Sequence, residues 1–339
     1  MKSPGNILIS RTDSIGDVIL TLPVAKKLRQ RFPESRIGFL GKEYTRAVIE
    51  ACSYIDQFIE VNDFLSDTHQ DLIDGYDTIL HVFPVAELAR RARELDIPLR
   101  VGTTNRLFHW GNCNKMIRLS RINSGLHEAQ LNLKLLAGLG IDERPSLDEL
   151  SDDIYLDRIK PLCKEFRHLI DPERFNLILH PKSQGSAREW GLPNFLQLIE
   201  QLDQNKFKIF ISGTATEREL LLGFLDKAGS RVTDLTGLMK LEDFISFINA
   251  SDGIIANSTG PLHIGAALGK HALGIYPPIR PMHPGRWAPI GRKASYFVVE
   301  KDCVDCRKNP VSCYCISQVS PSTIAEALGA RLGQKETTI

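Results

Sequence analysis

The sequence predicts an α/β protein made of two similar domains, each built around a parallel sheet. At about 150 residues per domain, its 339 residues are enough for two domains that each bury a core of their own. Short apolar runs typical of strands alternate with stretches in which apolar residues recur at helical spacing. The same alternation occurs in both halves of the chain, and strands that alternate with helices indicate a parallel sheet.

In the first half, three short apolar runs predict strands at residues 7–10, 36–40 and 78–83. Helical spacing predicts helices beside them at residues 18–32, 44–52 and 85–94. A further helical stretch at 128–139 ends at Gly140, and the following residues, 142–153, are acidic and contain a proline. We therefore place the domain boundary there, with domains at residues 1–155 and 156–339.

The second half repeats this order of elements. Strands are expected at residues 177–180, 208–212 and 253–256, and helices at residues 193–202 and 217–228. Another helix is expected to begin at Pro261, because a proline in the first turn loses no hydrogen bond by lacking an N–H. Two α/β halves of the same kind are the simplest interpretation.

The charge balance argues against a protein whose overall field attracts nucleic acid. Lys and Arg total 42 and Asp and Glu total 41, so the formal net charge is +1. An anionic ligand must therefore be bound by local donors, and we expect no nucleic-acid partner. With 42% hydrophobic and 24% charged residues, the composition is that of a folded globular protein.

The apolar run near the N-terminus does not indicate a signal peptide or a membrane span. Arg11, Asp13 and Asp17 interrupt it after a few residues, which is too short for either. We therefore expect a cytoplasmic protein.

Four of the seven cysteines crowd together near the C-terminus, at Cys303, Cys306, Cys313 and Cys315. Their C-x-x-C and C-x-C spacing is a poor match to a structural zinc site, which normally has two pairs with about two to four residues between the cysteines of each pair. Reduced thiols, or a disulfide formed on purification, are at least as good an interpretation.

Ligands of open parallel sheets bind outside the carboxyl ends of the strands. The polar loops after Ser10, His180, Ser212 and Ala256 are therefore the candidate sites. None of these loops has the G-x-G-x-x-G pattern of a dinucleotide site or the spacing of a P-loop. Hydride transfer and ATP hydrolysis are disfavoured for that reason.

The turn at residues 257–263 leads into a helix and could bind an anion. Backbone N–H groups and the positive end of the helix dipole can hold a phosphate there, with Ser258 and Thr259 adding hydroxyls. A simple N-cap is an equally good interpretation. His263 lies one turn into the helix, where a histidine is more often a packing residue than a ligand.

The loop at 180–190 carries two cations, Lys182 and Arg188, that could offset the charge of a diphosphate without a metal. The alternative is a solvated basic loop. Further along, Glu217 could accept hydrogen bonds from ribose hydroxyls, or it could be an ordinary acid in the first turn of its helix.

The loop at 11–17 joins the first strand to its helix. Gly16 lets the backbone approach a partner closely, and Asp17 places a carboxylate at the ligand edge of the sheet. That carboxylate could act as a general base on a hydroxyl group. The spacing of Ser14 and Asp17 also matches a capping box, which is a purely structural interpretation.

Taken together, these segments resemble the heptosyltransferase family, the ninth glycosyltransferase family, over nearly the whole chain. Each segment alone is a weak match, and their order and spacing carry the resemblance. The matching segments are residues 7–18, 21–23, 127–140, 179–181, 188–190, 213 with 217, 258–263 and 284–291.

The resemblance implies a GT-B fold, in which two Rossmann-like domains with parallel sheets face a central cleft. The acceptor is expected on the N-terminal domain and the nucleotide-diphosphate sugar on the C-terminal one. The implied reaction is inverting and metal-independent, and moves a heptose from an ADP-linked donor to a hydroxyl of the lipopolysaccharide core or a related glycan. No cofactor is implied, and a lipid-linked acceptor would bring the enzyme to the inner face of the cytoplasmic membrane.

Carried over to this chain, the resemblance makes Asp17 the base, and we expect Arg11, Ser14 and Gly16 to contact the acceptor. The donor is expected to contact Lys182, Arg188, Gly213, Glu217, Ser258, Thr259, Gly260 and His263. Family members commonly have Asp where this chain has Ser258, which leaves the identity of the donor open. Two alternatives are a nucleotide-sugar epimerase or hydrolase on the same fold and a non-catalytic nucleotide-binding protein.

Overall fold

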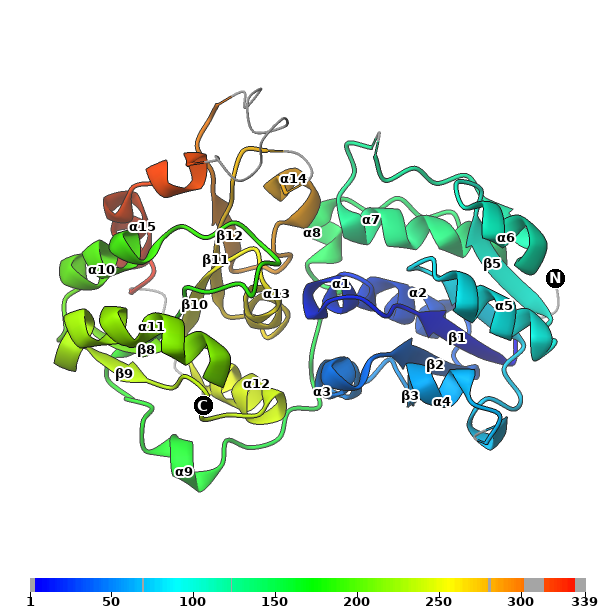
Figure 1. Cartoon of the computed structure of the whole chain (residues 1–339), viewed down its shortest axis with the longest axis horizontal. Helices are drawn as coiled ribbons and strands as arrows, with labels where there is room; N and C mark the ends of the chain where they lie inside the picture. The colour runs from blue at the N-terminus through cyan, green and yellow to red at the C-terminus, as the bar shows by residue number, and fades with distance from the viewer. Residues whose placement is uncertain (1–3, 69, 123, 280–281, 302–313, 333–339) are drawn as a thin grey trace. The chain divides into compact units, whose positions relative to one another are not determined.

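The computed structural model describes residues 4–68, 70–122, 124–279, 282–301 and 314–332. The chain divides into two compact units, Met1–Arg158 and Ile159–Ile339, and Figure 1 shows helices flanking a sheet in each of them. The predicted boundary, after residue 155, lies a few residues before the observed boundary between Arg158 and Ile159. In the described part of the chain, no helix is both long enough and apolar enough to cross a membrane.

The first unit contains a six-stranded sheet in the order β3-β2-β1-β4-β5-β6, and all its neighbouring strands are parallel. Its strands are β1 (Asn6–Ser10), β2 (Arg36–Gly41), β3 (Gln57–Glu60), β4 (Thr78–His81), β5 (Leu99–Thr103) and β6 (Lys115–Ile117). The apolar residues of β1 are completely buried, as a central parallel strand requires. The strands expected at 7–10, 36–40 and 78–83 are confirmed, the last ending at His81.

The helix expected over residues 18–32 is wrong as a single element. The structure has α1 (Ile15–Ile19) and α2 (Leu22–Arg31), separated by Leu20 and Thr21. Pro23 lies in the first turn of α2, and because it has no N–H it cannot donate the hydrogen bond that would continue α1. The break ends the short helix α1 just after Asp17.

The other helices expected in the first unit are present, the last of them divided into α7 (Glu128–Leu133) and η3 (Lys134–Leu139), and the structure adds short helices that were not predicted. The predicted end at Gly140 is confirmed, because this glycine caps the stretch in the left-handed conformation with a φ of 77°. The elements are η1 (Glu43–Thr45), α3 (Arg46–Glu50), α4 (Val61–Leu65), η2 (Gln70–Leu72), α5 (Ala86–Glu94), α6 (Leu107–Asn112), α7 (Glu128–Leu133), η3 (Lys134–Leu139) and α8 (Leu147–Leu150).

The second unit repeats the architecture, with a parallel sheet in the order β12-β11-β10-β7-β8-β9. Its strands are β7 (Phe175–His180), β8 (Phe207–Ile211), β9 (Val232–Asp234), β10 (Gly253–Asn257), β11 (His271–Ile275) and β12 (Ala294–Phe297). Its helices are α9 (Lys164–Arg167), α10 (Leu192–Gln201), α11 (Ala215–Ala228), η4 (Gly229–Arg231), α12 (Leu241–Ala250), α13 (Gly260–Ala267), α14 (Pro284–Trp287), η7 (Cys315–Gln318) and α15 (Pro321–Gly329). All strands and helices expected in this half are present.

The strand order fixes where a ligand can bind in each unit. The first strand of each sheet lies between the second and the fourth, which is the order of a Rossmann-like fold. The chain direction of the connections therefore reverses between β1 and β4 and between β7 and β10. Loops at the carboxyl ends of these strands diverge and leave room for a ligand.

His81 ends β4 as a fully buried side chain, and neither ring nitrogen has a hydrogen-bond partner in the described part of the chain. Burial, helped by the nearby His109 and Arg100, lowers the pKa of His81 to about 3. Because an unfolded histidine binds its proton near pH 6.5, acidification favours the unfolded chain between pH 6.5 and 3. From pH 7.5 to pH 5.5 the parent should lose about 1 kcal/mol more unfolding free energy than His81→Phe.

Chemical unfolding at the two pH values measures this difference. His168→Phe is the control, because it removes an exposed histidine. The stability of this variant should depend on pH as that of the parent does. Equal pH dependence of the parent and His81→Phe would show that His81 is not held neutral by burial.

Candidate active site

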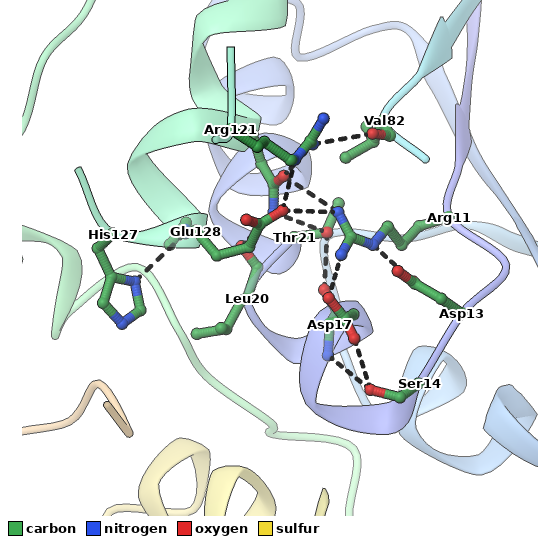
Figure 2. Close-up of polar contacts among 12 residues, drawn as sticks. Arg11, Asp13, Ser14, Asp17, Leu20, Thr21, Val82, Arg121, His127 and Glu128 are labelled. Atoms are coloured by element: carbon green, nitrogen blue, oxygen red, sulfur yellow. Dashed lines mark hydrogen bonds and ion pairs between the residues drawn. The ribbon is translucent and has the colours of Figure 1, made fainter. Parts of the chain in front are cut away.

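Arg11 follows β1 directly and is the centre of a buried ionic network in the first unit (Figure 2). Its Nε donates to Asp13 Oδ1 at 2.6 Å, its Nη1 lies 3.2 Å from Glu128 Oε1, and its Nη2 donates to Asp17 Oδ1. Nη1 also lies 3.2 Å from the side-chain oxygen of Asn132. The Arg11 side chain is 2% exposed, so its N–H groups donate to residues inside the unit and not to solvent.

The electrostatics of this network are dominated by the three carboxylates. Burial alone would lower the pKa of the Arg11 guanidinium, but Asp17, Asp13 and Glu128 together raise it, so the cation is permanent. Burial raises the pKa of Asp13 to about 6; the Arg11 charge opposes this shift and the Asp17 charge adds to it. Asp13 therefore titrates close to neutral pH.

Asp17 lies in α1 with both carboxylate oxygens held and with 15% of its side chain exposed. Ser14 Oγ donates to Asp17 Oδ2 at 2.6 Å and accepts weakly from the Asp17 N–H at 3.5 Å. Ser14 is therefore the N-cap of α1, but the reciprocal bond of a capping box, from the Ser14 N–H to the Asp17 carboxylate, is absent among the described residues. The N-cap does not use up the carboxylate, which still reaches the surface.

Glu128 at the start of α7 connects this network to a second arginine. Its Oε1 accepts from Arg121 Nε at 2.9 Å as well as from Arg11, and its side chain is 1% exposed. One turn later, Asn132 donates to the Leu20 carbonyl at 3.1 Å, just beyond α1. Figure 2 shows α7 and the loop after β1 joined in this way around Arg11.

No role was predicted for Glu128, Asn132 or Arg121 from the sequence. A signal was present, because Glu128 and Asn132 have the i, i+4 spacing that places two polar side chains on one face of a helix. What the sequence could not supply is their partner, since Arg11 lies 117 residues before Glu128.

In the second unit, the strand order brings three candidate loops to one edge of the sheet. β10, β7 and β8 are neighbours, so the loops that carry Thr259, Arg188 and Glu217 begin side by side. The Asn257 side chain links two of these loops: its Oδ1 accepts from the Trp190 N–H at 2.9 Å, and its Nδ2 donates to the Pro181 carbonyl at 3.0 Å.

The start of α13 has the features of an anion site. Thr259 is the N-cap residue by backbone conformation, yet its side chain makes no capping hydrogen bond. Its Oγ1 is buried and has no hydrogen-bond partner among the described residues. A buried hydroxyl without a partner is costly unless a ligand or water satisfies it. Gly260 follows in the first turn, Ser258 is half-buried, and His263 is buried one turn later.

A close helix–strand contact places this turn at the end of β10. A Cβ atom on Gly265 would lie 2.4 Å from Ile254 Cγ2, so only glycine lets α13 pack this tightly against the strand. The N–H groups of the first turn of α13 have no acceptor within the helix and point beyond the sheet edge. The positive end of the helix dipole adds to their attraction for an anion.

The other candidate donor residues differ in how much of their capacity is already used. Lys182 Nζ lies 2.6 Å from Glu189 Oε2, so its charge is paired within its own loop. Glu217 forms the capping box of α11, its Oε2 accepting from the Thr214 N–H at 2.8 Å. Arg188 is half-buried, with no ion pair or hydrogen bond to another described residue. Gly213 lies between β8 and Thr214, where its carbonyl accepts from the Gly237 N–H.

Most of the cysteine cluster lies outside the residues that the structure describes. Cys303, Cys306 and Cys313 lie outside the described residues, and Cys315 is buried in η7. Within the described ranges, no group of three or more His, Cys, Asp or Glu side chains could hold a metal ion. Zinc at the cluster stays a minority prediction.

Residues 132–316, more than half of the chain, match the model of glycosyltransferase family 9, the heptosyltransferases. The chain belongs to glycosyltransferase family 9. It is 18% identical over 307 residues to the lipopolysaccharide core heptosyltransferase OpsX of Haemophilus influenzae, covering 87% of this chain and 86% of that protein. The resemblance drawn from the motifs is confirmed, and the protein is a heptosyltransferase-like glycosyltransferase.

Two solved structures share the fold of this family 9 glycosyltransferase. A family 9 glycosyl transferase from Veillonella parvula aligns with a TM-score of 0.78 and 19% identity, over 99% of each chain. The ADP-heptose lipopolysaccharide heptosyltransferase II of E. coli aligns with a TM-score of 0.74 and 18% identity, over 98% of this chain and 100% of that one. The expected GT-B class with two Rossmann-like units is confirmed.

Proposed function

We propose that this family 9 glycosyltransferase moves a heptose from an ADP-linked donor to a hydroxyl of the lipopolysaccharide core, with inversion and without a metal. The observation that carries the proposal is the buried, unpartnered hydroxyl of Thr259 at the start of α13. ADP is the proposed nucleotide because the E. coli relative is named for ADP-heptose.

The second unit is proposed to bind the donor through its diphosphate. One phosphate oxygen would accept from Thr259 Oγ1 and from the free N–H groups of α13. Arg188 is the proposed counter-charge, because its guanidinium has no partner in the described residues while Lys182 is paired with Glu189. The chain also has no acidic residue from 253 to 299, so no nearby carboxylate of this stretch opposes an anion.

Three further candidates keep supporting roles in this proposal: Lys182, Glu217 and Ser258. Gly213 and His263 stay predicted donor contacts. Lys182 and Glu189 shape the loop that carries Arg188, and Glu217 can face the ribose only with the oxygen that does not cap α11. Ser258 offers a hydroxyl at the position where the family resemblance leads us to expect Asp.

The first unit is proposed to supply the base. Asp17 would take the proton from the acceptor hydroxyl as that oxygen attacks the anomeric carbon. The bond from that carbon to the diphosphate oxygen breaks on the opposite face, and ADP leaves with the electron pair. Attack and departure on opposite faces invert the anomeric configuration. The Arg188 guanidinium offsets the negative charge that develops on ADP.

Arg11 receives a different role from the one expected. At 2% exposure it has almost no surface with which to touch an acceptor, so we assign it to positioning Asp17 instead. Ser14 donates to the second carboxylate oxygen of Asp17, and Gly16, which directly precedes Asp17 in α1, is buried. The exposed part of Asp17 is therefore the proposed contact with the acceptor.

A donor screen by thermal shift tests the proposed function. ADP-heptose should raise the melting temperature more than UDP- or GDP-linked sugars, because a ligand that binds only the folded state stabilises it. Product analysis with and without a glycan acceptor then separates transfer from hydrolysis or epimerisation. Nucleotide binding with no turnover on any acceptor would favour the non-catalytic alternative.

Arg188→Ala should weaken ADP binding by about 10- to 100-fold, because a charge-assisted hydrogen bond to phosphate contributes about 1.5–3 kcal/mol. Isothermal titration calorimetry measures the affinity directly. Arg231→Ala, which removes an exposed arginine after α11, is the control and should bind ADP like the parent. Unchanged affinity of Arg188→Ala would remove this residue from the donor site.

A further inference from the structure

One segment of the first unit carries several cations and no acidic residue. No Asp or Glu occurs from residue 97 to residue 127, while five cations do: Arg100, Arg106, Lys115, Arg118 and Arg121. This segment contains β5, α6, the edge strand β6 and the loop that leads to α7. In a chain with a net charge of +1, such a stretch concentrates positive charge at one place in the unit.

The same segment exposes large apolar side chains. Leu107 is 89% exposed, Trp110 63% and Ile122 91%. Leu107 and Trp110 are three residues apart in α6 and so share one face, while His109 between them is fully buried against β5. The Trp110 indole N–H donates to the Thr104 carbonyl at 3.1 Å, which fixes the ring in its exposed position.

Three of the cations are available at this edge. Arg106, Lys115 and Arg118 are exposed and form no ion pair with other described residues. Arg121 and Arg100, by contrast, bond to Glu128 and to backbone carbonyls inside the unit. Residues 104–122 therefore expose three large apolar side chains and three cations that have no ion-pair partner among the described residues.

We propose that residues 104–122, here called the basic edge, dock this unit onto a bilayer that contains anionic lipid. Tryptophan favours the interface between headgroups and acyl chains, and aliphatic side chains insert beside it. Lys and Arg near an anionic surface each strengthen binding about fivefold. A nucleic acid would use the cations but leave Leu107 and Ile122 in water, so the combination favours a membrane.

This inference deepens the proposed function, because a lipid-linked acceptor has to be reached at a membrane surface. It does not depend on the identity of the donor. Vesicle binding tests the basic edge, and ADP binding tests the donor site, so the failure of one is distinguishable from the failure of the other.

The experiment is co-sedimentation of the full chain with vesicles of phosphatidylcholine alone or with one third phosphatidylglycerol. The parent should bind the anionic vesicles and lose that binding in 0.5 M salt. Replacing Arg106, Lys115 and Arg118 together by Gln should weaken it about 100-fold, since three cations are removed. Leu107→Ser with Trp110→Ser and Ile122→Ser should weaken it at least tenfold.

The control is Leu220→Ser with Leu222→Ser in α11, which removes two exposed leucines, 63% and 49% exposed, from the second unit. It should bind vesicles like the parent, and chemical unfolding of all variants should show parent-like transitions, which shows that both units are folded. The proposal is overturned if the parent binds neither vesicle, if it binds both equally, or if the basic-edge variants bind anionic vesicles as the parent does. Binding of the parent to single-stranded RNA but not to vesicles would also overturn it.

Discussion

Asp17→Asn should lower the rate of sugar transfer by about 100-fold or more while leaving ADP binding nearly unchanged. The amide has the shape of the carboxylate and can still bond to Arg11 and Ser14, but it cannot accept the proton of the acceptor hydroxyl. Single-turnover transfer measures the chemical step, and calorimetry with ADP measures donor binding. A fall in rate without a fall in affinity separates a base from a binding residue.

Asp13→Asn is the matched control for this experiment. Asp13 is a carboxylate on the same loop and bonds to the same guanidinium, at 2.6 Å, without being the proposed base. Its substitution should cost much less than 100-fold in transfer. If Asp17→Asn transfers sugar at nearly the parent rate while Asp13→Asn does not, the base is Asp13, whose pKa of about 6 would suit that role.

Arg11→Met should destabilise the first unit by about 3 kcal/mol and also lower transfer. The substitution keeps most of the apolar stem but leaves Asp13, Asp17 and Glu128 without their common cation, and Glu128 is 1% exposed. Removing one partner of a buried ion pair is costly because the remaining charges stay out of water. Chemical unfolding measures the stability change, and single-turnover kinetics measures transfer.

Arg46→Met is the control for the loss of an arginine that is ion-paired at the surface. Arg46 bonds to Glu43 at 2.7 Å, but its side chain is 39% exposed, so its loss should cost less than about 1 kcal/mol. Arg11→Lys should fall between the parent and Arg11→Met, because a compact ammonium keeps the charge but cannot span the three carboxylates as the separate nitrogens of the guanidinium do. Parent-like stability of Arg11→Met would mean that the network does not hold the loop.

Much of the fold follows from local patterns in the sequence. Apolar runs such as residues 7–9 are buried completely in central strands, and Gly140 ends its helical stretch as its conformational freedom predicts. Two central strands were missed, β5 (Leu99–Thr103) and β11 (His271–Ile275), although β11 is completely buried. The other missed strands include β3 (Gln57–Glu60) and β6 (Lys115–Ile117), which are short and lie at the edges of their sheet. Edge strands of this kind bury little, so the sequence pattern carries little signal for them.

The candidate site divides in the same way. Asp17 and Thr259 stand out in the sequence because each follows a strand and begins a helix, which is a local pattern. A place for Glu217 in the first turn of its helix was also among the local alternatives, and the structure shows it there, in a capping box. The contacts of Arg11 with Glu128 and of Asn257 with Trp190 join segments far apart in the chain, so no local pattern could reveal them.

A crystal structure of the protein with ADP bound would test the donor site most directly. We expect a diphosphate oxygen within hydrogen-bond distance of Thr259 Oγ1 and the first-turn N–H groups of α13, with the Arg188 guanidinium on the same phosphates. Well-ordered ADP bound elsewhere, with the Thr259 hydroxyl untouched, would contradict this expectation.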